Sequence, residues 1–411
     1  MGFSKDAQLV IIVGAGIVGL ALAQALKKEN IPFQLYERDQ GLDHLAAGWG
    51  ISINWALEAL EKCLPSELFT RVDDVQVDPE QGRQDTGRFL FLDLETLEPL
   101  YVIPPSPRKR VSRLGFRKLL AEGLDIRWGK ALSSFAPSAD GNGIVVQFAD
   151  GTSAHGAMLI AADGGRSRTR ALLLGEAGAL QPLPVRFIGV TATLDEEEMA
   201  PLRAIDPLLF KGTHPRTNHF LWFSVLSTPE TNGTAGSARP HYEAQINLSW
   251  PAAAGPEGEV PRTDPERLAR MRGAARGFHE VLRRAIERVP DGTVVREIKI
   301  ADWPPVEWQA GGLVTMLGDA AHPMTMYRGE AANHGLLDAS KLTEELKLWH
   351  GGSKTRAQAL EDFETEMRQR TRQAVLLSRQ ACLDAHDVAN LGPESPLVSK
   401  RARVMDPGLK A

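Results

Sequence analysis

Cysteine is scarce in this sequence of 411 residues, which has only Cys63 and Cys382. Two cysteines cannot build a disulfide framework or a cysteine-rich metal cluster, and no Cys-x-x-Cys spacing occurs, so we predict no metal site. The sequence also lacks a run of about 18 consecutive apolar residues, the length that a membrane-spanning helix needs. We therefore expect a cytoplasmic protein without a membrane span.

A large excess of charge of one sign is missing too. The chain has 47 Lys and Arg against 52 Asp and Glu, a net charge of −5, which gives no electrostatic reason to expect a nucleic-acid partner. Its 43% of apolar and 24% of charged residues are typical of globular proteins. Because 411 residues exceed one ordinary compact core, we expect two domains or one elaborated domain.

The first forty residues predict a strand, a glycine-rich turn, a helix and a second strand. Residues 9–13 are apolar and mostly β-branched, as in a buried parallel strand, and residues 20–28 favour a helix. The turn between them has the Gly-x-Gly-x-x-Gly spacing and consists of Gly14, Gly16 and Gly19. Such glycines allow a tight turn, a close approach to a pyrophosphate and close packing of helix on strand.

Glu37 ends the second predicted strand, where it can accept hydrogen bonds from ribose hydroxyls. We therefore predict a dinucleotide site at this turn; a tight turn without a ligand is the alternative. No second Gly-x-Gly-x-x-Gly occurs, so a separate nicotinamide domain is not expected.

Two further predicted strands end in an aspartate. Asp163 follows an apolar run at residues 159–162, and Asp319 follows one at residues 312–317. Ligands of open α/β sheets lie at the carboxyl ends of the strands. A carboxylate there can accept from a sugar-alcohol hydroxyl, as on the ribityl chain of a flavin, so we predict FAD as the cofactor.

Together these segments, from Val10 to about Arg379, resemble the FAD-dependent aromatic hydroxylases, single-component monooxygenases with the p-hydroxybenzoate hydroxylase fold. The sequence Gly-Asp-Ala-Ala-His-Pro at residues 318–323 matches the family residue for residue, and residues 163–168 match its Asp-Gly turn. Residues 48–57 look most like the fungal secondary-metabolite branch. The resemblance implies that Asp319 holds the ribityl chain, that Asp163 helps to form the flavin and NAD(P)H region, and that Arg113 contacts the flavin.

Residues 324–335 resemble the family's segment against the isoalloxazine ring. The resemblance adds three residues to the predicted FAD site: Gly329, Ala332 and Asn333. The family has a glycine where Ala331 stands here. His334 is a candidate catalytic residue that perturbs the ring; a structural histidine is the alternative.

The expected fold is α/β: a Rossmann-like FAD-binding domain with an inserted β-rich substrate domain and C-terminal helices. The predicted FAD-binding domain is discontinuous and comprises residues 1–75, 108–180 and 296–385. Residues 76–107 and 181–295 are predicted to form the β-rich domain, and 386–411 a C-terminal tail. We also expect a hairpin at residues 144–158, helical structure at 265–289, and long helices at 336–349 and 357–385.

Substrate contacts are assigned to the β-rich domain and to the ring segment. Arg186 matches a position where related enzymes often have an arginine near a phenolate, so it is a second candidate catalytic residue; a structural ion pair is the alternative. The candidate substrate residues are Trp222, Gln245, Asn247 and Tyr327.

The resemblance implies an NAD(P)H- and O₂-dependent monooxygenase. NADPH or NADH would reduce FAD, O₂ would add as the C4a-hydroperoxide, and one oxygen atom would pass to an aromatic or indole-like small molecule. The product would be a hydroxylated or epoxidised compound, with or without rearrangement, in secondary metabolism. A flavin-dependent reductase or dehydrogenase of the same fold, and a non-catalytic binding protein, remain as alternatives.

Overall fold

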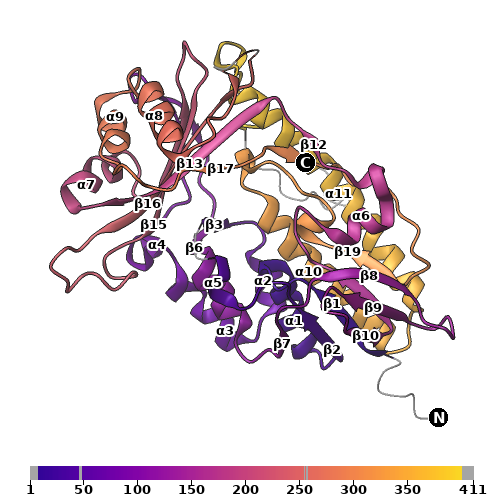
Figure 1. The fold of residues 1–411 in the computed structure, drawn as a ribbon. Helices are drawn as coiled ribbons and strands as arrows, with labels where there is room; N and C mark the ends of the chain where they lie inside the picture. The colour runs from indigo at the N-terminus through magenta and orange to yellow at the C-terminus, as the bar shows by residue number, and fades with distance from the viewer. Residues whose placement is uncertain (1–7, 46–48, 254, 256–257, 400–411) are drawn as a thin grey trace.

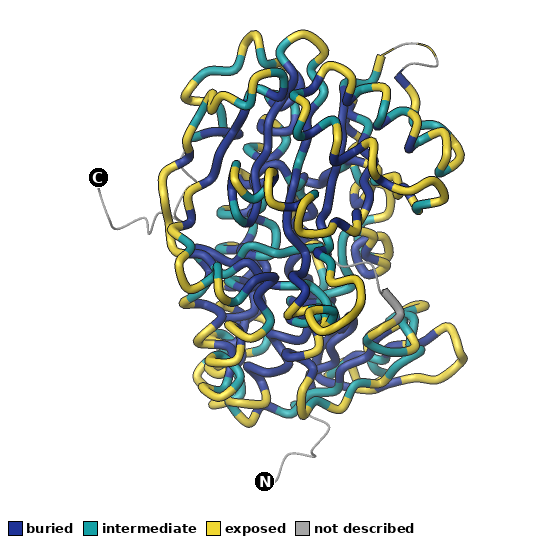
Figure 2. Tube along the Cα trace, turned by 90° about the vertical axis from the view of Figure 1, so that its left-hand side faces the viewer, coloured by how far each residue is buried: buried dark blue, intermediate teal, exposed yellow. Residues whose placement is uncertain are grey.

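The computed structural model describes residues 8–45, 49–253, 255 and 258–399 (Figure 1). Gly48 and the last twelve residues of the predicted tail, 400–411, lie outside the described residues. Two sheets organise the molecule, and buried residues run through both of them while exposed residues lie in the connecting loops (Figure 2). None of the described helices is long and apolar enough to cross a membrane.

A five-stranded parallel sheet forms one half, in the order β19-β11-β1-β2-β7. Its strands are β1 (Val10–Val13), β2 (Phe33–Tyr36), β7 (Ile126–Arg127), β11 (Met158–Ala161) and β19 (Val314–Met316). Most of these residues are apolar because both faces are covered. Helices α1 (Ile17–Lys28) and α10 (Ala331–His350) share the core on one face.

A three-stranded antiparallel sheet covers the other face of the parallel sheet. It consists of β8 (Leu132–Pro137), β9 (Ile144–Phe148) and β10 (Ser153–Gly156). The hairpin predicted at residues 144–158 is confirmed by the pairing of β9 with β10. Its turn contains Gly151 at φ +83°, a conformation that favours glycine.

A seven-stranded sheet forms the other half, in the order β17-β13-β16-β15-β14-β4-β5. Its strands are β4 (Phe89–Asp93), β5 (Pro99–Ile103), β13 (Val185–Leu194), β14 (Leu209–Thr213), β15 (Phe220–Ser227), β16 (Tyr242–Pro251) and β17 (Arg296–Glu297). One face packs against three helices on the outside of the molecule (Figure 1), namely α7 (Glu196–Ile205), α8 (Asp264–Ala275) and α9 (Glu280–Glu287). The other face, the inner face, packs against Tyr327 and against C-terminal residues such as Cys382 and Leu397.

The helical pattern predicted at residues 265–289 is confirmed, and the structure divides it into two helices. Helix α8 ends at Ala275 and α9 begins at Glu280. Between them Gly277 lies against the ring of His214, where a Cβ would stand 2.8 Å from Nε2. His279 then caps α9 by accepting from the backbone N–H of Val281. A glycine and a capping side chain thus interrupt an otherwise helical pattern.

Smaller elements connect the two halves. They are β3 (Gly50–Ile53), β6 (Lys109–Ser112), β12 (Gln181–Pro182) and β18 (Ala301–Asp302), with helices α2 (Leu57–Cys63), α3 (Ser66–Thr70), α4 (Pro79–Gln84), α5 (Arg113–Ala121) and α6 (Arg168–Leu174).

Helix α11 (Arg356–Asp384) runs along both halves of the molecule (Figure 1). At its start Arg356 donates to the carbonyl of Ala157, beside the parallel sheet, and just past its end the carbonyl of Ala385 accepts from Thr213 on β14. The chain after α11 packs back onto the sheet, where Leu397 and Val398 are buried. The predicted fold class is confirmed: a parallel sheet, a β-rich sheet and C-terminal helices are all present.

Candidate flavin and substrate site

The glycine turn leaves open space in front of α1. Gly14 has φ +107°, and a Cβ on it would stand 2.3 Å from the carbonyl oxygen of Ala162; a Cβ on Gly19 would stand 2.0 Å from that of Gly14. A Cβ on Gly16 would meet nothing within 4 Å. No side chain caps α1. Its first N–H groups and the positive end of its dipole therefore face room for a phosphate.

Glu37 is held beside this turn at the end of β2. Its Oε2 accepts from the backbone N–H of Ala15 at 2.6 Å, and its Oε1 accepts from that of Asp39 at 3.0 Å. The buried Arg117 donates to the carbonyl of Ala15 at 2.8 Å. Because a carboxylate oxygen can accept more than one hydrogen bond, Glu37 retains capacity for a ribose hydroxyl. The sequence reasoning missed Arg117, whose partner lies 102 residues away.

Asp163 follows β11 and has one oxygen without a partner. Its Oδ2 accepts from the backbone and hydroxyl of Thr169 at 3.1 and 3.3 Å, whereas its Oδ1 is buried and has no hydrogen bond. Buried polar atoms in native structures are rarely left unpaired. A ligand with a hydroxyl or N–H donor would satisfy this oxygen.

Arg170 joins the turn at Asp163 to the one at Asp319, and sequence reasoning did not single it out. Its Nη1 donates to the carbonyls of Asp319 and Ala320 at 3.3 and 2.9 Å. Its guanidinium lies 5.2 Å from the ring centroid of Trp303. Burial lowers the pKa of Arg170, with Asp163 and Asp319 acting in the opposite direction. An arginine near the start of a helix is ordinarily exposed to solvent, so the local sequence around Arg170 gave no sign that this residue joins the two turns.

Asp319 lines an opening inside the molecule. Asp319 is exposed, yet burial raises its pKa because protein surrounds the carboxyl closely. The two observations agree if the carboxyl faces a partly open cavity that protein surrounds on several sides. Arg113, at the start of α5, is near enough that each charge favours the ionised form of the other. Burial is nevertheless the largest effect on Arg113 and lowers its pKa.

A cavity of about 500 Å³ opens at Asp319. Its other walls come from the Asp163 turn, the edge near β17 and β18, and the chain after the Asp319 turn; its lining includes Gly165, Arg166, Leu180, residues 297–301 and residues 323–326. This volume is within the ordinary range for small-molecule sites.

The predicted ring segment leads from this cavity into α10. Gly329 adopts the left-handed conformation at φ +66°. Asn333 fastens the segment to β3, since its Oδ1 accepts from the N–H of Asn54 at 2.9 Å and its Nδ2 donates to the carbonyl of Ser52 at 3.0 Å. Ala332 lies in the first turn of α10, which has no side-chain cap. The positive end of this helix is thus free to face a ligand.

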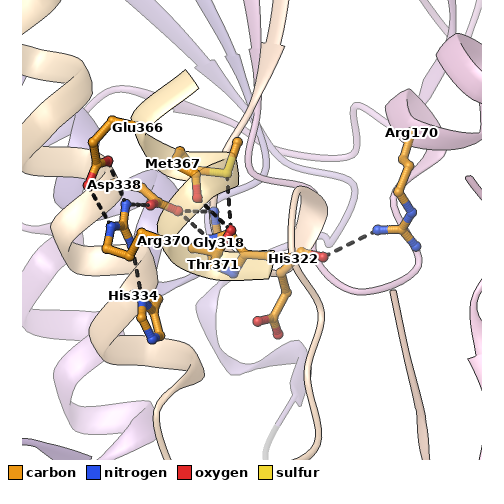
Figure 3. Close-up of polar contacts among 10 residues, drawn as sticks. Arg170, Gly318, His322, His334, Asp338, Glu366, Met367, Arg370 and Thr371 are labelled. Atoms are coloured by element: carbon orange, nitrogen blue, oxygen red, sulfur yellow. Dashed lines mark hydrogen bonds and ion pairs between the residues drawn. The ribbon is translucent and has the colours of Figure 1, made fainter. Parts of the chain in front are cut away.

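A buried charge network stands behind the ring segment (Figure 3). Asp338 is fully buried and accepts from the N–H of Gly318 at 2.8 Å, from Nε2 of His322 at 2.5 Å and from Arg370 at 2.7 Å. Burial alone would raise the pKa of Asp338, but His322 and Arg370 hold it well below its ordinary value. The network therefore ties the Asp319 turn to α10 and α11.

His334 belongs to this network. Its Nδ1 lies 3.0 Å from Nη1 of Arg370, which can only donate, so the ring proton is assigned to Nε2. Burial, followed by Arg370 and His322, holds the pKa of His334 well below its usual range. The second ring nitrogen points away from Arg370 (Figure 3). The ring also contacts Trp55, with centroids 4.8 Å apart.

The inner face of the seven-stranded sheet carries most of the predicted substrate residues. Side chains alternate along each strand, and Ile246 and Leu248 pack outward against α8 and α9. The inner face includes Phe91, Phe187, Gly189, Phe220, Trp222, Ser224, Gln245, Asn247 and Ser249. Tyr327 reaches it from the ring segment: its hydroxyl donates to Ser249 Oγ at 2.9 Å, and its side chain is only 1% exposed.

Arg186 is not brought to this face. It lies on the same side of β13 as the outward Ile188, and its guanidinium pairs with Glu259 at 3.2 Å. The structure thus gathers Trp222, Gln245, Asn247 and Tyr327 on one side of the sheet and places Arg186 on the other. The catalytic assignments of Arg186 and His334 stay predictions.

These features suit FAD. The open space at Gly16 suits a pyrophosphate, the unpaired oxygen of Asp163 suits a hydroxyl or N–H donor, and the exposed carboxyl of Asp319 inside a cavity suits a ribityl chain. Among the described residues, no group of three or more His, Cys, Asp or Glu side chains is arranged to hold a metal ion.

Comparison with known proteins agrees with this interpretation. The family model described as FAD binding domain matches residues 7–378. The FAD-dependent monooxygenase dbaB of Emericella nidulans is 52% identical over 341 residues, covering 82% of this chain and 86% of that protein. A probable FAD-dependent monooxygenase of Arthroderma benhamiae is 40% identical over 429 aligned positions, covering 100% of this chain and 99% of that protein.

A solved structure shows the same fold. The 2,6-dihydroxypyridine-3-hydroxylase from Arthrobacter nicotinovorans aligns with a TM-score of 0.76 over 99% of this chain and 100% of that one, at 18% identity. The resemblance inferred from the sequence is confirmed, and of the three classes that the sequence left open the relatives support the monooxygenase. The chain belongs to the family of FAD-binding monooxygenases and is an FAD-dependent monooxygenase.

Proposed function

We propose that this monooxygenase inserts one oxygen atom of O₂ into an aromatic or indole-like small molecule of fungal secondary metabolism, with NADPH or NADH as reductant. The observation that carries the proposal is an aromatic cluster between the inner face and the ring segment. Its members include Trp49, Phe91, Phe187, Phe220, Trp222 and Tyr327. Trp49 and Trp222 are only partly buried, and aromatic rings of this kind favour a flat aromatic ligand through offset and edge-to-face contacts.

The chain's own residues hold the cofactor and exclude water. The turn at Gly14–Gly19 and the start of α1 would hold the pyrophosphate, and Asp319 would accept from the ribityl hydroxyls. The start of α10 would place its positive end near the ring, where reduction adds negative charge. Bound FAD supplies the reaction of a reduced flavin with O₂.

The aromatic cluster supports the last part of the proposal, transfer of oxygen to a ring. Phe91, Phe187 and Phe220 are each no more than 1% exposed, so the inner face is dry beside the ring segment. Exclusion of water by these side chains would protect the oxygen chemistry that bound FAD supplies from unproductive side reactions.

The test is a turnover experiment under ¹⁸O₂. FAD-loaded protein is supplied with NADPH or NADH and with a panel of phenols, naphthols and indoles, and the products are analysed by mass spectrometry. We expect oxygen consumption stimulated by at least one aromatic compound and a product heavier by one ¹⁸O atom. A parallel reaction in H₂¹⁸O should give no labelled product. No oxygen consumption with any combination, or an unlabelled product, would overturn the proposal.

A further inference from the structure

Two neighbouring amide side chains on the inner face of β16 have no hydrogen-bond partner among the described residues. Asn247 is 2% exposed and Gln245 is 6% exposed. The Oδ1 atom of Asn247 is sealed from solvent and unpaired. Buried side-chain amides in native structures almost always make hydrogen bonds. The sealed and unpaired oxygen of Asn247 therefore indicates a missing partner, and the side chain of Gln245 stands beside it on the same face of the strand.

The strands on both sides of Asn247 make room for it. Asn247 pairs with Gly189 on β13 and with Trp222 on β15. A Cβ on Gly189 would lie 2.0 Å from Asn247 Oδ1, so any other residue there would displace the amide. Gly189 has no left-handed backbone conformation that would otherwise call for glycine. The glycine is thus best explained by the space that the Asn247 amide occupies.

The neighbouring side chains add an aromatic surface and a positive charge. The guanidinium of Arg110 lies 6.0 Å from the ring centroid of Trp222 and donates to Ser224 Oγ at 2.6 Å. Ser224 is the cross-strand neighbour of Gln245. The two amides therefore stand beside an indole ring and a buried cation. The positive charge of Arg110 favours a ligand oxygen with negative charge at this place.

We propose that Asn247, with Gln245 beside it, determines substrate specificity by hydrogen-bonding an oxygen substituent of a hydroxylated aromatic ring that packs against Trp222. The inference rests on the proposed function and narrows its substrate class from aromatic compounds to phenols and their anions. An amide both donates and accepts, so it pairs with a hydroxyl, a phenolate or a carbonyl. A site built for such an oxygen rejects an analogue that lacks it, because the amide is then left unpaired.

The test measures binding rather than turnover, so that it can fail independently of the ¹⁸O₂ experiment. The probes are 2-naphthol and 2-methylnaphthalene, which have the same ring system and differ in the oxygen. Each is titrated into the FAD-loaded wild type and into Asn247→Leu, and binding is followed by the change in flavin absorbance. We expect the wild type to prefer 2-naphthol by roughly 10- to 100-fold, and Asn247→Leu to lose that preference.

Asn232→Leu is the matched control. Asn232 is an amide of the same half of the molecule, but it is fully engaged: its Nδ2 donates to the carbonyl of His241 at 2.9 Å and its Oδ1 accepts from Thr234. Asn232→Leu should therefore lower the thermal midpoint and keep the preference for naphthol. Asn247→Leu should retain or raise the midpoint and keep its FAD, because it removes an amide that has no partner.

A second variant tests the same contact without deleting the amide. Gly189→Ala should displace the Asn247 side chain and weaken the preference for 2-naphthol while FAD binding is kept. The proposal is overturned if the wild type shows no preference for 2-naphthol, or if Asn247→Leu keeps that preference. It is also overturned if Asn247→Leu lowers the thermal midpoint as Asn232→Leu does, because that result would indicate a structural role with bound water.

Discussion

The two large sheets of this protein build their parts of the site in opposite ways. At the five-stranded sheet, the site lies at the ends of strands and consists of backbone N–H groups, glycines and a few carboxylates such as Asp163 and Asp319. At the seven-stranded sheet, the proposed substrate site lies across the middle of strands and consists of alternate side chains, among them Trp222 and Asn247. The first arrangement suits a constant cofactor, and the second suits a substrate that differs between relatives.

The difference has a physical basis. A pyrophosphate is recognised by backbone geometry, so a change at the glycine turn alters the path of the chain and affects folding as well as binding. On the inner face, a substrate would be recognised by side chains that a rigid sheet holds in place. A substitution there should therefore change which ligand binds and leave the fold intact. The following variants should separate the two cases.

The largest effect is expected at Gly14. Gly14→Val places a branched side chain at φ +107° and a Cβ 2.3 Å from the carbonyl oxygen of Ala162. We expect a loss of about 3 kcal/mol or more in the free energy of unfolding and no bound flavin. Chemical denaturation and the ratio of flavin to protein absorbance measure both. A yellow protein of normal stability would show that the turn is not needed in this conformation.

Asp319→Ala should weaken FAD binding by roughly 10- to 100-fold, because it removes acceptors for ribityl hydroxyls. Unlike Gly14→Val, it should not destabilise the apoprotein, since burial raises the pKa of Asp319 and so disfavours its charge. Titration of apoprotein with FAD, followed by quenching of flavin fluorescence, gives the affinity. Equal affinity in wild type and variant would remove Asp319 from the cofactor site.

His334→Gln should change the pH dependence of stability. The folded protein holds the pKa of His334 well below its ordinary value of about 6.5, so its neutral ring contributes stability that is fully present above that pH and is lost as the pH falls. Between pH 7.5 and 5.5 the wild type should lose about 1 kcal/mol through this group, and His334→Gln should lose less. His155→Gln, at an exposed position on β10, is the control and should behave as the wild type does.

The smallest effect is expected at Arg186. Its ion pair with Glu259 is partly exposed and lies away from the inner face, so Arg186→Ala should change the free energy of unfolding by less than about 1 kcal/mol. FAD affinity and the binding of 2-naphthol should stay as in the wild type. A large loss of naphthol binding would place Arg186 in the substrate site after all.

The comparison also explains what the sequence could predict. Gly14, Gly16 and Gly19 signal a site through local spacing, and Asp163 and Asp319 follow short apolar runs, so these were found from the sequence. Arg117 and Arg170 were missed because they act on backbone carbonyls 102 and up to 150 residues away, and a buried arginine has the same local pattern as an exposed one. Arg370, on α11, was missed because its carboxylate partner Asp338 lies 32 residues away on another helix.

Only some residues of the inner face could be predicted from the sequence. Strands β15 and β16 contain apolar residues on both faces, so the alternation that distinguishes inner from outer side chains is weak in the sequence. The sequence placed Trp222, Gln245 and Asn247 on strands. It did not show that Gly189 lies beside Asn247 and leaves room for its amide. Such cross-strand relations depend on register, which the turns and the whole sheet determine.

The most direct test of this account is the FAD affinity of Gly16→Ala. A Cβ at this position meets no protein atom within 4 Å, so folding gives no reason for a glycine here, and only an approaching pyrophosphate does. The account predicts that apoprotein with Gly16→Ala unfolds at the wild-type temperature and binds FAD at least about 10-fold more weakly. Wild-type FAD affinity in this variant would contradict the placement of the cofactor on the glycine turn.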